Sequence, residues 1–134
     1  MKATATGDPV PPDGALFVVD SEYTGRCARL ALHGELDVAT VSVLDEELRR
    51  AWAQTDIRRM ELDLRGVTFM GSAGVAALLG ANARARDRGC ALTLVRGTDR
   101  IHRIFELTGI ADQFAYRSQS ARPDARSSSL RIVT

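Results

Sequence analysis

Apolar residues at every second position predict the strands of this chain. The alternation is clearest in two segments, residues 27–32 and 62–64. Shorter apolar runs predict further strands at residues 16–19 and 91–95 and an edge strand within 110–116. The predicted turn at Tyr23–Gly25 is short, so the first two strands are expected to form an antiparallel hairpin.

Apolar residues three or four positions apart predict three helices. The first runs to about Trp52 after a cap at Asp37 or Thr40, the second from Ser72 to about Arg88, and the third from Asp99 to Leu107. Ser72 is the expected N-cap of the second helix and Thr98 that of the third.

The order of these elements predicts the fold class. Two strands are followed by helices that alternate with single strands, which is typical of an α/β fold with crossover helices. We therefore expect a mixed, mostly parallel sheet of four to five strands with helices packed on it. The predicted domain spans residues 14–117, after a flexible lead at 1–13 and before a disordered tail at 118–134.

Composition excludes several classes of function. The 134 residues carry a net charge of +1 and only 5% aromatic residues, which argues against a nucleic-acid-binding surface. No apolar run is long enough to span a bilayer, and no signal peptide is visible at the N-terminus. We therefore expect a cytoplasmic protein without membrane contact.

Cysteines and histidines suggest no metal site. Cys27, Cys90, His33 and His102 follow no metal-ligand spacing. Two reduced, partly buried thiols are the expected state of the cysteines. Neither a metal nor a cofactor is predicted.

The segment 62–79 joins a strand, a turn and a helix, an arrangement that several catalytic motifs share. A nucleophile elbow needs Gly-x-Ser-x-Gly, but Met70 stands at its first position before Ser72. The spacing from Gly66 to Ser72 is that of a P-loop without its lysine. Glu35 and Asp37 form a carboxylate pair that is better interpreted as a helix cap or a loop edge. No enzyme activity is therefore predicted, and the outward helix start remains a place for an anion or a partner.

Four segments resemble STAS domains, the family of anti-sigma factor antagonists and sulphate-transporter tails. His33-Gly-Glu-Leu-Asp37 with Ala39-Thr40 resembles the family's segment before its first helix. The other three segments are residues 62–70, 72–79 and 103–110, which resemble the central strand, the Asp-Ser-Ser-Gly turn with its helix, and the last helix. Together they cover about residues 15 to 116 in the family's order.

The resemblance implies a regulatory domain without catalytic activity. Its stand-alone members bind an anti-sigma factor, often a serine kinase with an ATPase-like fold, and so control sigma factor release and transcription. The kinase switches them off by phosphorylating the second serine of the turn. In this chain Gly71, Ser72 and Ala73 align with Asp-Ser-Ser, and alanine cannot accept a phosphate. Three interpretations follow: constitutive partner binding, phosphorylation of Ser72 instead, or a scaffold or small-ligand module for a nucleotide or anion, including a transport-accessory role.

The resemblance places the partner contact at the central turn and at the loop before the first helix. The predicted partner-binding residues are Leu36, Asp37, Thr40, Phe69, Met70, Gly71, Ser72, Ala73, Gly74 and Val75. For Ser72, a plain helix cap is the simpler interpretation and a phosphorylation site the alternative. The expected oligomeric state is a monomer or a weak homodimer.

Overall fold

Five strands form one mixed sheet in the computed structural model, which describes residues 16–54 and 56–117. The strands are β1 (Phe17–Thr24), β2 (Cys27–Leu36), β3 (Arg59–Met70), β4 (Ala91–Val95) and β5 (Ala115–Tyr116). They lie in the order β1-β2-β3-β4-β5. β1 is antiparallel to β2, and the other neighbours are parallel. The predicted fold class is therefore confirmed.

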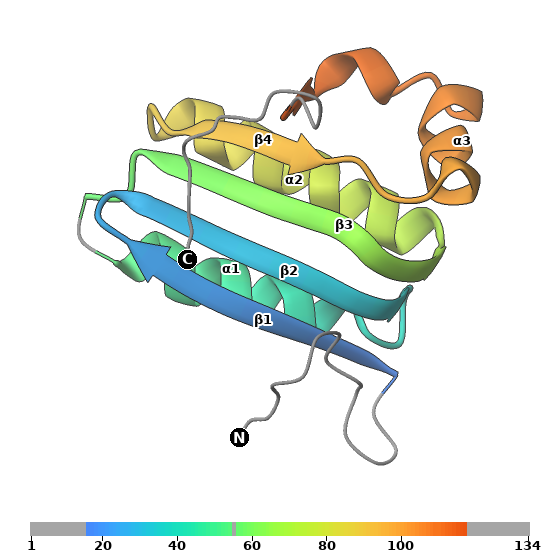
Figure 1. Cartoon of the computed structure of the whole chain (residues 1–134), viewed down its shortest axis with the longest axis horizontal. Helices are drawn as coiled ribbons and strands as arrows, with labels where there is room; N and C mark the ends of the chain where they lie inside the picture. The colour runs from blue at the N-terminus through green and yellow to red at the C-terminus, as the bar shows by residue number, and fades with distance from the viewer. Residues whose placement is uncertain (1–15, 55, 118–134) are drawn as a thin grey trace.

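Three helices connect these strands. They are α1 (Val41–Ala53), α2 (Ser72–Asp87) and α3 (Asp99–Leu107), and a short 3-10 turn, η1 (Ala111–Gln113), precedes β5. Figure 1 shows α1 and α2 side by side on one face of the sheet, with α3 beyond the end of β4. No described helix covers the opposite face, which we call the open face.

The core lies between the sheet and the helices. The strand leucines that recur at every second position point into it, as the alternation predicts, and Leu30, Leu32 and Leu62 are fully buried. Leu44 and Leu78 meet them from α1 and α2, and α3 contributes Ile101 and Phe105. Burial of each such side chain stabilises the fold by about 1.5–3 kcal/mol.

Several predicted boundaries were wrong because strand pairing extends beyond the local pattern. β1 continues past the expected residue 19, since Tyr23 and Thr24 pair with Ala28 and Cys27, and the chain turns at Gly25 and Arg26 instead. β2 continues to Leu36, which pairs with Met70. The expected edge strand at 110–116 is η1 followed by the two-residue β5. The predicted lead at 1–13 and tail at 118–134 lie outside the described residues.

Asp63 is a buried carboxylate on β3, and its exposed fraction is 6%. Its oxygens accept hydrogen bonds from the Arg65 backbone N–H at 3.0 Å and from the Arg65 guanidinium at 2.8 Å. Burial raises the pKa of Asp63, but the hydrogen bonds from Arg65 and the positive charges of Arg65 and Arg29 outweigh it and hold the pKa below its usual value.

Asp63 is therefore expected to make the stability of the fold depend on pH. A lowered pKa in the folded state adds stability above the unfolded pKa of about 3.9, and this stability is lost as the pH falls through the folded value. Asp63→Asn is expected to lower the free energy of unfolding by about 1–3 kcal/mol at pH 7, with a smaller loss at pH 3. Urea unfolding at both pH values measures this difference. Asp45→Asn, on the exposed side of α1, is the control, and a loss for Asp63→Asn that is independent of pH would contradict the assignment.

Candidate functional site

The ends of β2 and β3 lie side by side, and each is followed at once by a helix. Leu36 pairs with Met70 at the last position of both strands. Because the two strands are parallel, the loops after them and the starts of α1 and α2 come to the same edge of the sheet (Figure 1). The fold therefore brings together the two predicted segments, residues 36–40 and 69–75, which are about thirty residues apart in sequence.

Two glycines make this approach close. The Gly71 backbone N–H donates a hydrogen bond of 2.9 Å to the Leu36 carbonyl oxygen. A Cβ atom at Gly71 would overlap the Asp37 carboxylate, and one at Gly74 would lie 2.8 Å from the Leu36 carbonyl oxygen. The start of α2 is thus fitted against the loop before α1, and glycine is required at position 74 because a side chain there would meet the Leu36 backbone.

This fit predicts opposite effects for two substitutions in α2. Gly74→Ala is expected to lower the free energy of unfolding by about 1–3 kcal/mol, because the new methyl group meets the rigid Leu36 backbone. Gly80→Ala is the matched control: nothing lies within 4 Å of its Cβ, so better helix propensity should raise stability by about 0.5–1 kcal/mol. Chemical denaturation of both variants tests this, and stabilisation by Gly74→Ala would contradict the close fit.

Thr40 fixes the loop before α1. Its hydroxyl donates to the Glu35 carbonyl oxygen at 2.6 Å and accepts from the Asp37 backbone N–H at 3.0 Å. Thr40 occupies the N-cap position of α1, as one of the two expected caps, but its side chain bonds backward into the loop and not to a helical N–H. Its buried hydroxyl therefore holds residues 36–39 in place.

The predicted N-cap of α2 was wrong. Gly71, in an extended conformation, occupies the N-cap position, and Ser72 is the first helical residue. No side chain caps this helix end, so the Ser72 hydroxyl is not engaged in the expected cap bond and the residue is exposed. The extended conformation of Gly71 places the N-cap one residue before Ser72, although serine is the residue type that favours the N-cap position.

The remaining predicted residues divide by burial. Leu36, Thr40, Met70 and Gly74 are buried and support the surface from below. The others reach it, and Phe69 has an exposed fraction of 46%. We use the name helix-start surface for the accessible residues of the two segments, Asp37, Val38, Ala39, Phe69, Gly71, Ser72, Ala73 and Val75.

Two apolar side chains at this edge were missed from the sequence. Val38, in the loop before α1, is 75% exposed, and Val43, in the first turn of α1, is also exposed. Their positions in the sequence could have indicated exposure, because Val38 lies in a loop and Val43 lies outside the apolar stripe of α1 that Leu44 and Leu48 define. Exposed apolar groups near one another are typical of a protein-binding surface.

The geometry offers no catalytic arrangement around Ser72. His33 lies in the sheet paired with Gly66, His102 stacks against Phe105, and neither hydrogen-bonds to Ser72. Within residues 16–54 and 56–117, no three His, Cys, Asp or Glu side chains are grouped as metal ligands. Both cysteines are free, as predicted, and burial raises the pKa of each thiol.

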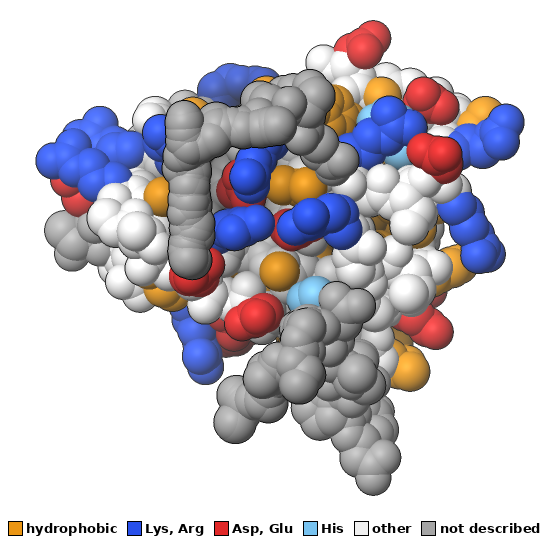
Figure 2. All heavy atoms as spheres, viewed as in Figure 1, with side chains coloured by type: hydrophobic (Ala, Val, Ile, Leu, Met, Phe, Trp, Pro, Cys, Tyr) orange, Lys and Arg blue, Asp and Glu red, His pale blue; other side chains and the backbone are white. Residues whose placement is uncertain are grey.

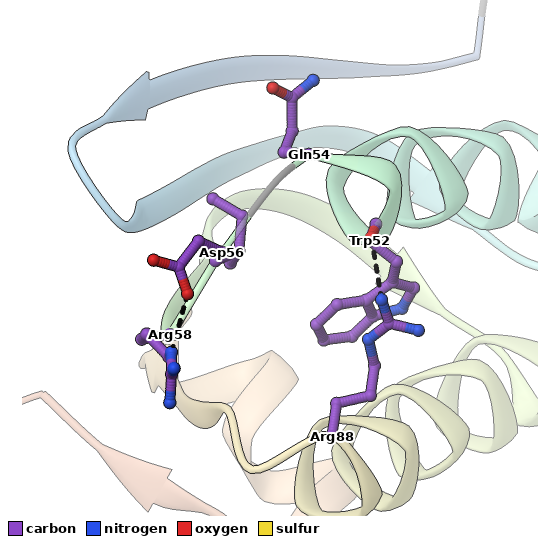
Figure 3. A pocket seen from close by; sticks show the side chains of 6 residues that line it. Trp52, Gln54, Asp56, Arg58 and Arg88 are labelled. Atoms are coloured by element: carbon purple, nitrogen blue, oxygen red, sulfur yellow. Dashed lines mark hydrogen bonds and ion pairs between the residues drawn. The ribbon is translucent and has the colours of Figure 1, made fainter.

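A hollow of about 400 Å³ lies at the opposite end of the sheet from the helix-start surface. Figure 3 shows the Arg88 guanidinium over the Trp52 ring, 5.2 Å from its centroid, while it donates to the Trp52 carbonyl oxygen at 2.9 Å. Across the hollow, Arg58 pairs with Asp56 at 3.0 Å. The first contact joins the end of α1 to the end of α2, and the second lies within the segment before β3, so a structural role accounts for both.

Comparison with known proteins agrees with this architecture. The family model of the Mlab STAS domain matches residues 19–116. The anti-sigma-B factor antagonist of Listeria monocytogenes is 34% identical over 79 residues, which cover 59% of this chain and 68% of that protein. The anti-sigma-B factor antagonist of Staphylococcus aureus is 35% identical over 79 residues, covering 59% and 72%.

A solved structure shows the same fold. The anti-sigma factor antagonist from Mycobacterium paratuberculosis superposes with a TM-score of 0.64 at 20% identity, covering 78% of this chain and 87% of that one. In the described part of the chain, no helix has the length and apolar character needed to cross a membrane. The match to the family model over most of the chain, together with these relatives, shows that the chain belongs to the STAS domain family.

Proposed function

We propose that this chain is a regulatory protein that binds an anti-sigma factor and so controls the release of a sigma factor. Two relatives that are 34% and 35% identical are anti-sigma-B factor antagonists. The structural observation that carries the proposal is the helix-start surface: Val38 and Phe69 are exposed on two segments that Gly71, Gly74 and Thr40 hold together. A rigid surface with exposed apolar groups binds a partner without a large ordering cost.

The proposed partner is an anti-sigma factor with the ATPase-like fold of a serine kinase. The resemblance aligns Ala73 with the serine that such a kinase phosphorylates in other members of the family. Ala73 is half-buried in the first turn of α2, within the helix-start surface. An alanine at this position removes the phosphate acceptor, so we propose that the interaction is constitutive.

Ser72 provides the alternative acceptor. It is exposed, it precedes Ala73 in the same helical turn, and no cap bond holds its hydroxyl. A phosphate there would introduce about −1.5 to −2 charges into the same surface. The two proposals differ in one observable: only phosphorylation of Ser72 makes partner binding sensitive to the kinase and ATP.

The experiment is a capture from the native cytoplasm with two baits, the natural chain and Ser72→Glu, read by mass spectrometry. An ATPase-fold anti-sigma factor held by both baits, without phosphate on residues 69–75, supports constitutive binding. The same factor lost with Ser72→Glu, with phosphate on Ser72 of the natural bait, supports a switch moved by one residue. Absence of any such factor from both baits contradicts the antagonist proposal and favours a scaffold or small-ligand module.

A further inference from the structure

The open face of the sheet contains a strip that is buried although no described helix covers it. Asp63 on β3 pairs with Val95 on β4, and both side chains point away from the core formed by Leu62 and Leu94. Yet Asp63 is only 6% exposed and Val95 only 2%. Arg29 and Arg65 contact Asp63 and account for part of its burial, but Val95 is an apolar residue on a face that no described helix covers.

A hollow continues this strip toward β1. It has a volume of about 370 Å³ and is lined by Asp20, Ser21, Glu22, Arg29, Ala31 and Asp63. The register explains it: Asp20 pairs with Ala31, and Ala31 pairs with Asp63, so a small side chain separates two carboxylates along one row across the sheet. The hollow is therefore open above Ala31, with Asp20 and Glu22 on one side and Asp63 on the other, and Arg29 is the positively charged residue of its lining.

The ion pairs of this face leave two of its carboxylates unmatched. Arg29 binds Glu61 at 2.7 Å, Arg65 binds Asp63 at 2.8 Å, and Arg117 binds Glu61 at 2.9 Å. Asp20 and Glu22 on β1 form no ion pair with another residue in the described part of the chain. Figure 2 shows positive and negative side chains gathered in the middle of this face. A positively charged group above Ala31 would complement the two free carboxylates of β1.

The described chain reaches this face at its last residue. The Arg117 backbone N–H donates to the Leu94 carbonyl oxygen at 2.9 Å, and the Arg117 side chain contacts Glu61 two strands away, on the open face. The sequence that follows, residues 118–134, contains Arg122, Arg126 and Arg131 and a single acidic residue, Asp124. This segment therefore starts at the open face and carries a net positive charge, opposite in sign to Asp20 and Glu22.

Its length suffices to reach the hollow. Arg117 directly follows β5, and Ala31 at the centre of the hollow lies on β2, three strand spacings away, which is about 14 Å at about 4.8 Å per spacing. The five residues from Arg117 to Arg122 span up to about 17 Å when extended at about 3.3 Å per residue. An arginine side chain adds several ångströms of reach.

We propose that residues 118–134 dock across the open face from β5 toward β1, with the Arg122 guanidinium in the hollow beside Asp20, Glu22 and Asp63. The docked segment covers Val95 and Asp63, and the Arg122 charge partly offsets the negative charge of Asp20 and Glu22. It leaves the helix-start surface free, because that surface lies at the edge of the sheet where α1 and α2 begin.

Trypsin cleavage of the full chain tests this proposal. The bonds after Arg117 and Arg126 should be cut at least tenfold more slowly than in a synthetic peptide of residues 112–134. The double variant Asp20→Asn/Glu22→Gln, and separately Arg122→Gln, should each speed both cuts at least fivefold without changing the melting temperature by more than a few degrees. The bond after Arg122 is not a readout, because Pro123 follows it.

The control variant is Asp45→Asn/Asp87→Asn, which removes the same number of carboxylates from exposed positions on α1 and α2. It should leave both cleavage rates unchanged. Cleavage as fast as in the free peptide would overturn the proposal. So would cleavage of Asp20→Asn/Glu22→Gln and of Arg122→Gln at the rate of the natural chain. Protection that disappears when the protein is diluted would also overturn it, because the segment would then bind a second copy.

Discussion

The variant Ala73→Ser, after treatment with its anti-sigma kinase and ATP, is expected to bind its partner at least about 100-fold more weakly than before treatment, a loss of about 2.8 kcal/mol. The natural chain should keep its affinity under the same treatment. The physical reason is the position of residue 73, half-buried in the first turn of α2 and within the helix-start surface. A phosphate there must be desolvated on binding, and it adds about −1.5 to −2 charges to the helix-start surface. Titration calorimetry before and after treatment measures the change.

Two controls separate this effect from others. Untreated Ala73→Ser should bind like the natural chain, because one added hydroxyl carries no charge. The double variant Ser72→Ala/Ala73→Ser should lose affinity as Ala73→Ser does, which assigns the phosphate to residue 73. A natural chain that loses its partner after treatment would show that the kinase modifies another residue, and constitutive binding would be wrong.

Phe69→Ala is expected to weaken partner binding by about 30-fold or more, which corresponds to about 2 kcal/mol. Phe69 is the largest exposed apolar side chain of the helix-start surface, with 46% of its area accessible. Because it is already largely outside the core, its removal should change the melting temperature by only a few degrees. Surface plasmon resonance and a thermal melt measure the two quantities on the same sample.

Tyr23→Ala is the matched control for Phe69→Ala. Tyr23 is an aromatic residue with a similar exposed fraction, 38%, but it lies at the hairpin end of β1, opposite the helix-start surface. It should not change partner affinity. Equal losses from both substitutions would indicate that the partner uses a different or much wider surface.

For elements with a strong local sequence signal, the predicted first and last residues match those of the structure. The strand at 91–95 and the helix at 99–107 match β4 and α3, and the Thr98 hydroxyl accepts a capping hydrogen bond from the Ile101 N–H at 3.3 Å. In both segments, the same short stretch of sequence carries the signal for the element and for its boundaries. β1 was underestimated because its second half carries polar residues whose strand conformation depends on pairing with β2.

That residues 36–40 and 69–75 lie together was predictable, but the contacts that join them were not. The resemblance brought residues 36–40 and 69–75 into one surface. The contacts that join them, from Gly71 and Gly74 to Leu36 and Asp37, depend on how two parallel strands end together, and no local pattern reveals such contacts. For the same reason the cap of α2 was assigned to Ser72, and the exposure of Val38 was not foreseen.

The proposed antagonist role is tested most directly by sigma factor release. The purified chain is added to a preformed complex of a sigma factor and its ATPase-fold anti-sigma factor from the same genome, and free sigma factor is measured by size-exclusion chromatography. We predict that the chain releases the sigma factor in proportion to its concentration, with or without ATP, and that Phe69→Ala releases much less. A complex that stays intact at a large excess of the natural chain, for every such anti-sigma factor of that genome, would contradict the role.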